Sequence, residues 1–371
     1  MDVVTPWEEG GLVRVYLHPG HEKSKEPWPA VTVGRVGDPE DAAFADVDND
    51  GTLAVVSCCE GKTQAIFVHR LSNLQQLLDE AAWTTERVEI ADGRQWMQCL
   101  PIRLSLGRTV LVVGSKGHDG VLGVLMPFPA GEVVASPWRL IPLTDAGWIM
   151  SIEQTPNRPK LRVGDANSDR AASAVVPVTQ TETRFFVSDR KGPRRGVSEW
   201  TVSHDPLAKD GKFATKLRDV GGQNHEVMFL AAGQLGQFRL TNDSDDAVVT
   251  TGDGPLLCLS GNGRVSEIPM PQGCGTGKAV AIDDLNGDGR RDLAVTCENA
   301  KGTTGVFWLE QTNVLDATDE ARWRFHDISG RDGTKFDRIE LVDLDGDGDL
   351  DLLTCEEAEG LGVIWYENPL K

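Results

Sequence analysis

Short runs of apolar residues alternate with polar residues along nearly the whole chain, and acidic turns that contain glycine separate these runs. A period of two is typical of strands that bury one face, whereas only the stretch Asn73–Ala82 has a briefly helical pattern. No apolar run approaches the roughly 18–20 residues that a membrane-spanning helix needs. The pattern therefore predicts an all-β protein without membrane insertion.

One strand–turn–strand unit recurs along the chain. The last copy, Asp351–Pro369, and the first residues, Asp2–Pro19, share an acidic start, an apolar pair, Thr, an acidic turn with Gly, an apolar strand and a closing Pro. The same unit returns at Ala54–Arg70 and at Asp292–Glu310. Weaker copies have their turns at residues 116–120, 188–192 and 252–254. Such self-similarity at a long period is typical of repeat architectures.

A further strand follows several of these units and begins at a tryptophan. These strands start at Trp28, Trp83, Trp138 and Trp323. Seven units with short, regularly spaced strands predict a seven-bladed β-propeller that occupies residues 1–371 as one domain; six blades and an accessory hairpin are the alternative. The first unit lacks its first strand, so we expect the N- and C-terminal segments to pair and close the ring, and the natural chain to start further upstream.

Three loops just before the second strand of a unit carry oxygen-bearing side chains at relative positions 0, 2 and 4, with Gly at position 5, and two of them also carry one at position 8. The predicted metal ligands are Asp284, Asn286, Asp288 and Asp292 in one loop, Asp343, Asp345, Asp347 and Asp351 in another, and Asp46, Asp48 and Asp50 in the third. This spacing is similar to that of an EF-hand loop, and a hard cation such as Ca²⁺ needs six to eight such oxygens. A solvated acidic turn is the alternative for each loop.

The loops differ in how complete they are. Ala54 stands where the loop at Asp46 should have its fourth acidic ligand, so we expect a lower affinity there. The stretch Asp165–Asp169 keeps three ligands but lacks the glycine and the last acidic residue, so it is interpreted as a decayed copy. Calcium is thus predicted as a structural ion along one arc of the ring.

The phrases at residues 44–51, 282–289 and 341–348 resemble the FG-GAP/VCBS repeats of bacterial secreted proteins and of integrin α-chain propellers. The resemblance implies a β-propeller with calcium in its loops. A looser similarity is to the propeller portion of aldos-2-ulose dehydratases, which implies an action on oxidised sugars.

The composition limits the partners. Lys and Arg number 37 against 57 Asp and Glu, which gives a formal net charge of −20. This field repels phosphate backbones, so nucleic acid is excluded as a partner, and it suits cations. Seven cysteines without a CxxC pair indicate neither a disulfide framework nor a zinc site.

The turns between second and third strands should lie on the face opposite the metal loops, beside the starts of the first strands. Residues predicted to bind a ligand there are Glu60, Trp96, His118, Trp148, Glu298 and Glu357. Tryptophan rings stack on sugars and carboxylates accept hydroxyl hydrogen bonds, so a carbohydrate or protein ligand is expected at this face. The alternative is that glutamates recur at equivalent turns only because they keep these turns solvated.

Two functions remain open at this point. The first is a binding module, and the second is a carbohydrate lyase or dehydratase acting on an oxidised or anhydro sugar. In the second, His225 or Glu226 takes a proton beside a carbonyl, and Arg190 or Lys278 steadies the oxyanion. No nucleophile elbow, P-loop or HExxH motif occurs.

The expected location is secreted or periplasmic, because extracellular calcium suits loops of modest affinity, although no signal peptide is visible at the start. The protein is expected to be a monomer.

Overall fold

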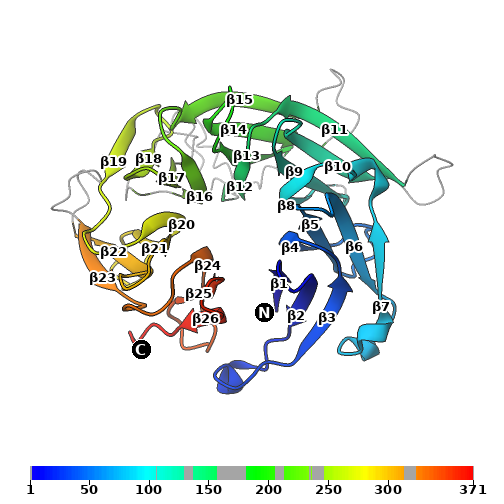
Figure 1. Ribbon diagram of the computed structural model, residues 1–371, viewed down its shortest axis with the longest axis horizontal. Coiled ribbons are helices and arrows are strands. Elements are labelled where there is room, and N and C mark those ends of the chain that lie inside the picture. Colours follow the sequence, from blue (N-terminus) through cyan, green and yellow to red (C-terminus); the bar gives the residue numbers. More distant parts are fainter. Residues whose placement is uncertain are drawn as a thin grey trace, which may run out of the picture.

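The computed structural model describes residues 2–105, 107–128, 137–156, 181–204, 213–233, 235, 246–312 and 323–370. These residues form seven separate antiparallel sheets arranged around a central axis (Figure 1). The predicted seven-bladed β-propeller is therefore confirmed, and the alternative of six blades and a hairpin is not observed.

Five of the blades have four strands, which run in order from the centre of the ring to its rim. Blade 2 consists of β4 (Pro39–Ala45), β5 (Ala54–Cys59), β6 (Ala65–Leu71) and β7 (Trp83–Arg87). Blade 3 consists of β8 (Gln95–Arg103), β9 (Thr109–Lys116), β10 (Val121–Pro127) and β11 (Trp138–Asp145). Blade 4 consists of β12 (Ile149–Gln154), β13 (Glu182–Asp189), β14 (Gly196–Ser203) and β15 (Ala214–Gly221).

Blades 5 and 6 repeat this arrangement. Blade 5 consists of β16 (Val227–Gly233), β17 (Asp246–Thr251), β18 (Leu256–Leu259) and β19 (Val265–Ile268). Blade 6 consists of β20 (Thr276–Asp283), β21 (Asp292–Glu298), β22 (Val306–Gln311) and β23 (Trp323–Asp327). Four short 3₁₀ helices are described in the loops of the first two blades: η1 (His21–Lys23), η2 (Leu74–Gln76), η3 (Glu80–Ala82) and η4 (Glu89–Ala91).

The first and last blades have three strands each. Blade 1 consists of β1 (Val3–Trp7), β2 (Leu12–Tyr16) and β3 (Ala30–Arg35), and blade 7 consists of β24 (Phe336–Val342), β25 (Asp351–Glu356) and β26 (Gly362–Tyr366). In the described chain, β1 pairs only with β2, and no strand joins the two terminal sheets. The prediction that the terminal segments pair is therefore wrong: the two blades adjoin through side chains instead.

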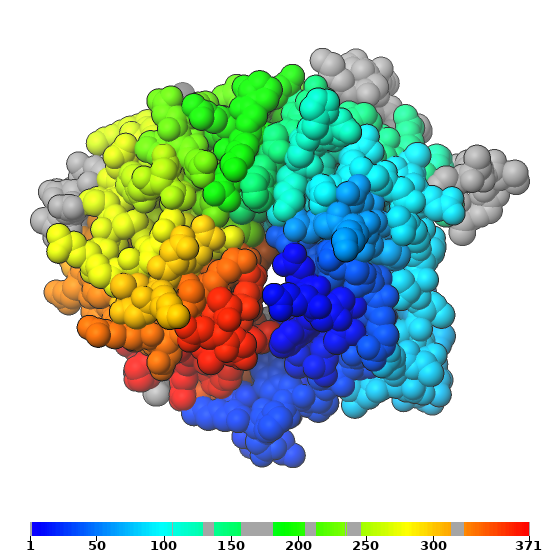
Figure 2. Space-filling model, viewed as in Figure 1, coloured from blue at the N-terminus to red at the C-terminus, as the bar shows by residue number. Residues whose placement is uncertain are grey.

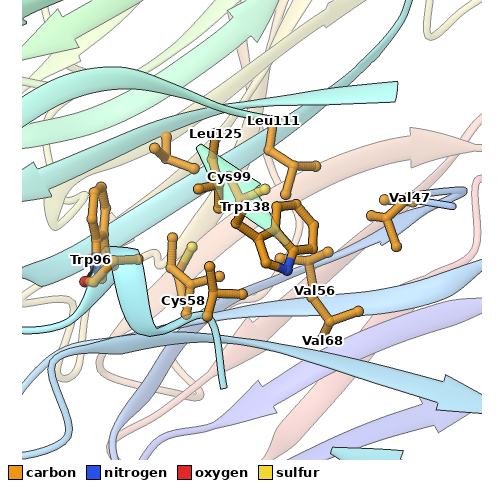
Figure 3. Packing of buried hydrophobic residues seen from close by; sticks show 14 of the residues in the cluster. Val47, Val56, Cys58, Val68, Trp96, Cys99, Leu111, Leu125 and Trp138 are labelled. Atoms are coloured by element: carbon orange, nitrogen blue, oxygen red, sulfur yellow. Dashed lines mark hydrogen bonds between the residues drawn. The ribbon is translucent and has the colours of Figure 1, made fainter. Parts of the chain in front are cut away.

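Hydrophobic side chains fill the spaces between neighbouring blades. Figure 3 shows the space between blades 2 and 3, where Val56 and Cys58 of β5 meet Trp96 and Leu111 of blade 3. Similar clusters fill the other junctions from blade 1 round to blade 7. Both faces of a middle strand are thus buried, which explains why β5 and β17 have every residue buried.

Hydrogen bonds from Ser and Thr side chains also join neighbouring blades. Thr250 donates to the carbonyl of Lys278 at 2.6 Å, and Thr296 donates to that of Asp337 at 2.6 Å. Ser188 makes the same bond to Met228 at 2.7 Å. Each hydroxyl lies on the second strand of one blade and each acceptor on the innermost strand of the next. These bonds fix the offset between blades 4 to 7.

Candidate functional site

The three metal loops all connect the innermost strand of a blade to the second strand, in blades 2, 6 and 7. Because neighbouring strands are antiparallel, these loops share one face of the ring, while the turns after the second strands lie on the other. The two faces predicted from the sequence are therefore present.

The loop of blade 2 has the side chains that a cation would satisfy best. Oxygens of Asp46, Asp48 and Asp50 lie within 4.8 Å of one another. Asp46 is only 4% exposed, and neither of its carboxylate oxygens accepts a hydrogen bond from the described residues. Among the residues that the structure describes, the exposed Arg103 is the one cation paired with it, with Nη1 3.5 Å from the carboxylate. Buried carboxylate oxygens are normally hydrogen-bonded or bound to a metal, so this loop fits a cation although it lacks a fourth acidic residue.

The loop of blade 7 also brings its predicted ligands together. Oxygens of Asp343, Asp345 and Asp351 lie within 4.8 Å of one another. Asp343 accepts backbone hydrogen bonds from Gly346 at 2.7 Å and Gly348 at 3.1 Å, which hold the loop closed. The predicted ligand Asp347 accepts from the backbone of Asp349 at 3.1 Å.

The loop of blade 6 is closed by its own hydrogen bonds. Asp284 accepts from the backbone of Gly289 at 2.7 Å, and Asn286 accepts from that of Asp288 at 3.0 Å. The side chain of Asp288 forms an ion pair with Arg290. Asp292 is fully buried, and burial raises its pKa to about 6. This loop keeps the predicted ligands, but a cation would have to displace Arg290 from Asp288. The decayed copy at Asp165–Asp169 lies outside the described residues.

On the opposite face, β-bulges position the side chains that surround the central opening. The register shifts near the start of every innermost strand that the structure describes, in blades 2 to 7. A bulge re-aims the residue that it inserts. The residues at these shifts include Glu40, Met97, Met150, Phe229, Lys278, Asp337 and Arg338. Six of these seven line a cavity of about 620 Å³, and Lys278 pairs with one of them, Asp337.

Trp148 is surrounded by three cations from two neighbouring blades. The ammonium of Lys116 lies 4.7 Å from the centre of the ring, the guanidinium carbon of Arg190 lies 4.9 Å away, and the ammonium of Lys191 lies 4.9 Å away. Glu60 pairs with Lys116, and Glu226 pairs with Arg190 at 2.9 Å. The cations occupy the positions from which a sugar would stack on the indole.

Asp189 holds this group of residues in place. Its buried carboxylate accepts backbone hydrogen bonds from Gly147 at 3.0 Å and Trp148 at 2.7 Å. Burial raises the pKa of Asp189. The start of blade 4 is thereby tied to the turn that carries Arg190 and Lys191.

The predicted catalytic residues fall into two groups. His225 lies beside Asp253, with 3.6 Å between Nδ1 and Oδ1, and Asp253 also accepts from the backbone of Glu226 at 3.1 Å. Arg190 joins this group through Glu226. Lys278 instead pairs with Glu298 at 3.3 Å and lies 3.8 Å from Asp337. Each predicted cation thus already has a carboxylate partner.

A cluster of carboxylates stands where blades 7, 1 and 2 meet. Oxygens of Glu8, Glu40 and Glu60 lie within 4.8 Å of one another. Loss of solvent, followed by the charges of Asp337, Glu60 and Glu8, raises the pKa of Glu40 to about 8. Burial and the charge of Asp337 raise the pKa of Glu357 to about 7, although Lys335 pairs with it. Crowding of these carboxyl groups thus adds to burial in raising their pKa values.

Two predicted ligand-binding residues lie elsewhere. The prediction for Trp96 is wrong, because its ring is fully buried between blades and its Nε1 donates to the carbonyl of Ala91 at 2.6 Å. His118 is at a fully exposed turn, where it contacts only the neighbouring Asp119 at 2.8 Å among the described residues.

The sequence reasoning missed Phe229 and Arg338, which are at the central opening. Arg338 lies 5.3 Å from the centre of the Phe229 ring and pairs with Asp41 at 2.8 Å. Lys278 lies 5.7 Å from the same ring. These positions interrupt the alternation of their strands, because a bulge places an extra residue there. Comparing the starts of the innermost strands would have found them.

A family model described as an FG-GAP-like repeat matches residues 284–354, which include the metal loops of blades 6 and 7. The predicted resemblance is confirmed for this segment. No curated protein matches the chain.

Among solved structures, BBS1N in complex with ARL6DN, soaked with lead, is 12% identical over 99% of this chain and 91% of that chain, with a TM-score of 0.47. The same complex soaked with mercury gives 12% identity over 97% and 88%, with a TM-score of 0.45. The computationally designed Ika8 protein gives 12% identity over 98% and 94%, with a TM-score of 0.41.

Proposed function

We propose that this protein is a calcium-stabilised β-propeller that binds a carbohydrate or protein ligand at the face opposite the metal loops. The observation that carries the proposal is the group of cations around Trp148. Because these cations cover the indole, the ligand is expected to be recognised through acidic groups rather than by stacking of a neutral sugar.

Lys191 is the cation that a ligand would meet first. It is exposed, and no carboxylate among the described residues pairs with it, whereas Lys116 and Arg190 have partners. An acidic ligand would therefore gain an ion pair with Lys191 without breaking one inside the protein. The fixed backbone around Asp189 supports a preformed site, which lowers the entropic cost of binding.

Binding can be tested with an array of neutral and acidic glycans and, separately, with a protein pull-down under calcium. We expect an acidic ligand to be retained, and Lys191→Glu to weaken its binding roughly tenfold or more. Lys301→Glu is the matched control, because Lys301 is exposed in the equivalent turn of blade 6. Absence of any ligand at millimolar concentration, or equal loss in both variants, contradicts the proposal.

The calcium part of the proposal is supported chiefly by Asp46, whose buried oxygens have no hydrogen-bond donor among the described residues. Titration calorimetry with Ca²⁺ should detect binding to the intact chain, and Asp46→Asn should weaken the site in blade 2. Mg²⁺ is the control, because it requires a stricter octahedral geometry. Unaltered heats in Asp46→Asn would refute the assignment of this residue.

A secreted or periplasmic location is part of this proposal, because calcium is plentiful there. None of the described helices has the length and apolar character that crossing a bilayer demands.

A lyase or dehydratase is the second candidate. It is favoured by His225, whose Nδ1 faces Asp253 and accepts or donates no hydrogen bond among the described residues. Such a histidine can accept a proton. Turnover of oxidised or anhydro sugars that is unchanged in His225→Ala and Glu226→Gln would eliminate these roles.

A further inference from the structure

Blade 1 has no innermost strand among the described residues. In blades 2 to 6, the second strand pairs with an innermost strand on one side and with the third strand on the other. β1 holds the second position, because its register with β2 matches that of β25 with β26, yet its other edge has no partner in the described chain. A free strand edge offers unpaired backbone donors and acceptors.

The space beside β1 is bordered by the same strands that border the innermost strand of a complete blade. In the complete blades that strand packs against the innermost strands on both sides and against the second strand of the preceding blade. The cavity of about 620 Å³ is lined by the corresponding strands β1, β4, β24 and β25. Figure 2 shows an opening at this place, between the N-terminal segment in blue and the C-terminal segment in red.

The carboxyl groups at this groove are arranged like those that surround Lys278 in blade 6. In blade 6, the bulge residue Lys278 lies between Glu298 of its own blade and Asp337 of blade 7. Lys278, Asp337 and Glu40 each precede the first residue of their metal loop by the same number of residues, so they are equivalent positions of blades 6, 7 and 2. The repeat also makes Glu8 of blade 1 equivalent to Glu298 of blade 6. The missing strand would thus place its bulge residue near Glu8, Glu40 and Asp337. Lys278 lies 3.8 Å from Asp337 and Lys335 pairs with Glu357, but Glu8 and Glu40 form no ion pair among the described residues.

We propose that this groove binds an extended peptide segment, which pairs with β1 as the innermost strand of blade 1 and places a Lys or Arg among Glu8, Glu40 and Asp337. Small apolar residues follow the cation, as Ala279 and Val280 follow Lys278 in β20. Pro6 lacks a backbone donor, so the ladder runs mainly along residues 2–5 of the chain. This site adjoins the cations around Trp148 through Glu60, which pairs with Lys116, but it does not include Lys191. The Lys191→Glu variant therefore tests the first proposal without changing the groove, and the two proposals can fail independently.

The chain's own β20 supplies a probe. A fluorescent peptide with the sequence of residues 275–285 should bind the intact protein in an anisotropy titration. At pH 8.5, where Glu40 is mostly ionised, the same peptide with Lys278→Glu should bind at least roughly tenfold more weakly, because its Glu would face the carboxylates of Glu8, Glu40 and Asp337. A peptide with Val280→Pro and Ala281→Pro should not bind. Successive backbone amides of a strand point to opposite edges, so one of these two amides faces β1, and proline removes its N–H donor.

Variants of the protein then locate the site. Glu8→Gln with Glu40→Gln should remove the preference for the lysine peptide over the glutamate peptide, whereas Glu22→Gln, at an exposed position outside the groove, should preserve it. Hydrogen exchange should show new protection at the amides of β1 when the peptide is added.

Three results would overturn the proposal: no binding at millimolar peptide, equal affinity for the lysine and glutamate peptides, or protection confined to strands other than β1. Sedimentation of the protein alone provides the remaining test. A dimer whose formation excludes the peptide would identify a second copy of the chain as the occupant and would refute the proposal as well.

Discussion

The junction between blades 7 and 1 differs from the other six junctions of the ring. Hydrophobic clusters fill the spaces from blade 1 round to blade 7, whereas none spans the last junction among the described residues. The contacts across that junction include two polar ones: His18 Nε2 lies 2.7 Å from the carbonyl oxygen of Leu344, and Lys25 pairs with Glu367 at 2.8 Å. The ring of Trp7 also lies against Gly362.

The comparison shows what an innermost strand contributes to a blade. Every residue of β5 is buried, because β4 covers one edge and neighbouring blades cover both faces. Every residue of β1, at the equivalent place, is only partly buried. The same repeat therefore builds a packed interior or an open groove according to whether its first strand is present.

The largest predicted difference concerns aromatic side chains. Phe307 is fully buried between blades 5 and 6, so Phe307→Ala should lower the free energy of unfolding by about 3–5 kcal/mol. Trp7 is partly exposed at the open junction, so Trp7→Ala should cost about 1 kcal/mol or less. Chemical denaturation measures both values. Equal losses would mean that the two junctions are packed alike.

Calcium should act on the arc that includes the open junction. With Ca²⁺ at 100 times its Kd, each independent site adds about 2.7 kcal/mol to the stability of the folded state. Chelation should therefore lower Tm and increase hydrogen exchange in blades 2, 6 and 7 more than in blades 3 to 5. Asp343→Asn should reproduce part of this loss, and Asp119→Asn, at an exposed turn of the other face, should not. Uniform changes around the ring would contradict this expectation.

The hydrogen bonds between blades give a smaller difference. Thr296 is fully buried and donates to the carbonyl of Asp337 in the next blade, so Thr296→Val should cost about 1–2 kcal/mol by leaving buried groups unpaired. Thr5 instead accepts from Trp7 Nε1 at 2.8 Å within its own blade. Thr5→Val should therefore cost less than Thr296→Val in the same denaturation experiment, and the reverse order would be evidence against this role of Thr296.

The smallest effect depends on pH. Glu40 has a pKa of about 8 in the folded protein and near 4.5 when unfolded, so the folded state retains a proton that the unfolded state releases between these values. The contribution of Glu40 is fully present below pH 4.5 and is lost as pH rises through 8.

Replacing Glu40 by Gln should remove this loss. Glu40→Gln should match the original protein at pH 5 and exceed its stability at pH 8.5 by about 1 kcal/mol, a modest value because water reaches the opening. Thermal melts across this pH range measure the difference. A parallel pH dependence in both proteins would show that Glu40 titrates normally.

The repeat could be predicted from the sequence because its signals are local. Alternating strands, acidic turns and the tryptophans at Trp83, Trp138 and Trp323 correctly placed the second, third and outer strands. The spacing of Asp343, Asp345 and Asp351 likewise brought three carboxylates together. Each of these features depends on residues close together in the chain.

Features that depend on neighbouring blades could not be predicted in this way. Trp96 is at the start of a strand, like Trp148, but a hydrophobic cluster encloses one ring and cations surround the other. The bulges that turn Phe229 and Arg338 towards the opening disturb the strand period that the sequence analysis relied on. The absence of pairing between the terminal blades also follows from three-dimensional geometry rather than from a motif.

The contacts of His18 and Lys25 join blades 7 and 1 on one face of the ring. Both residues follow β2, and both of their partners, Leu344 and Glu367, lie on the metal-loop face of blade 7. The opposite face of the junction is where the groove opens. These two contacts therefore hold the blades together at the end of the junction that lies away from the groove. A cation bound in the loop at Asp343, as proposed, would reinforce this end of the junction and not the end at which the proposed groove opens.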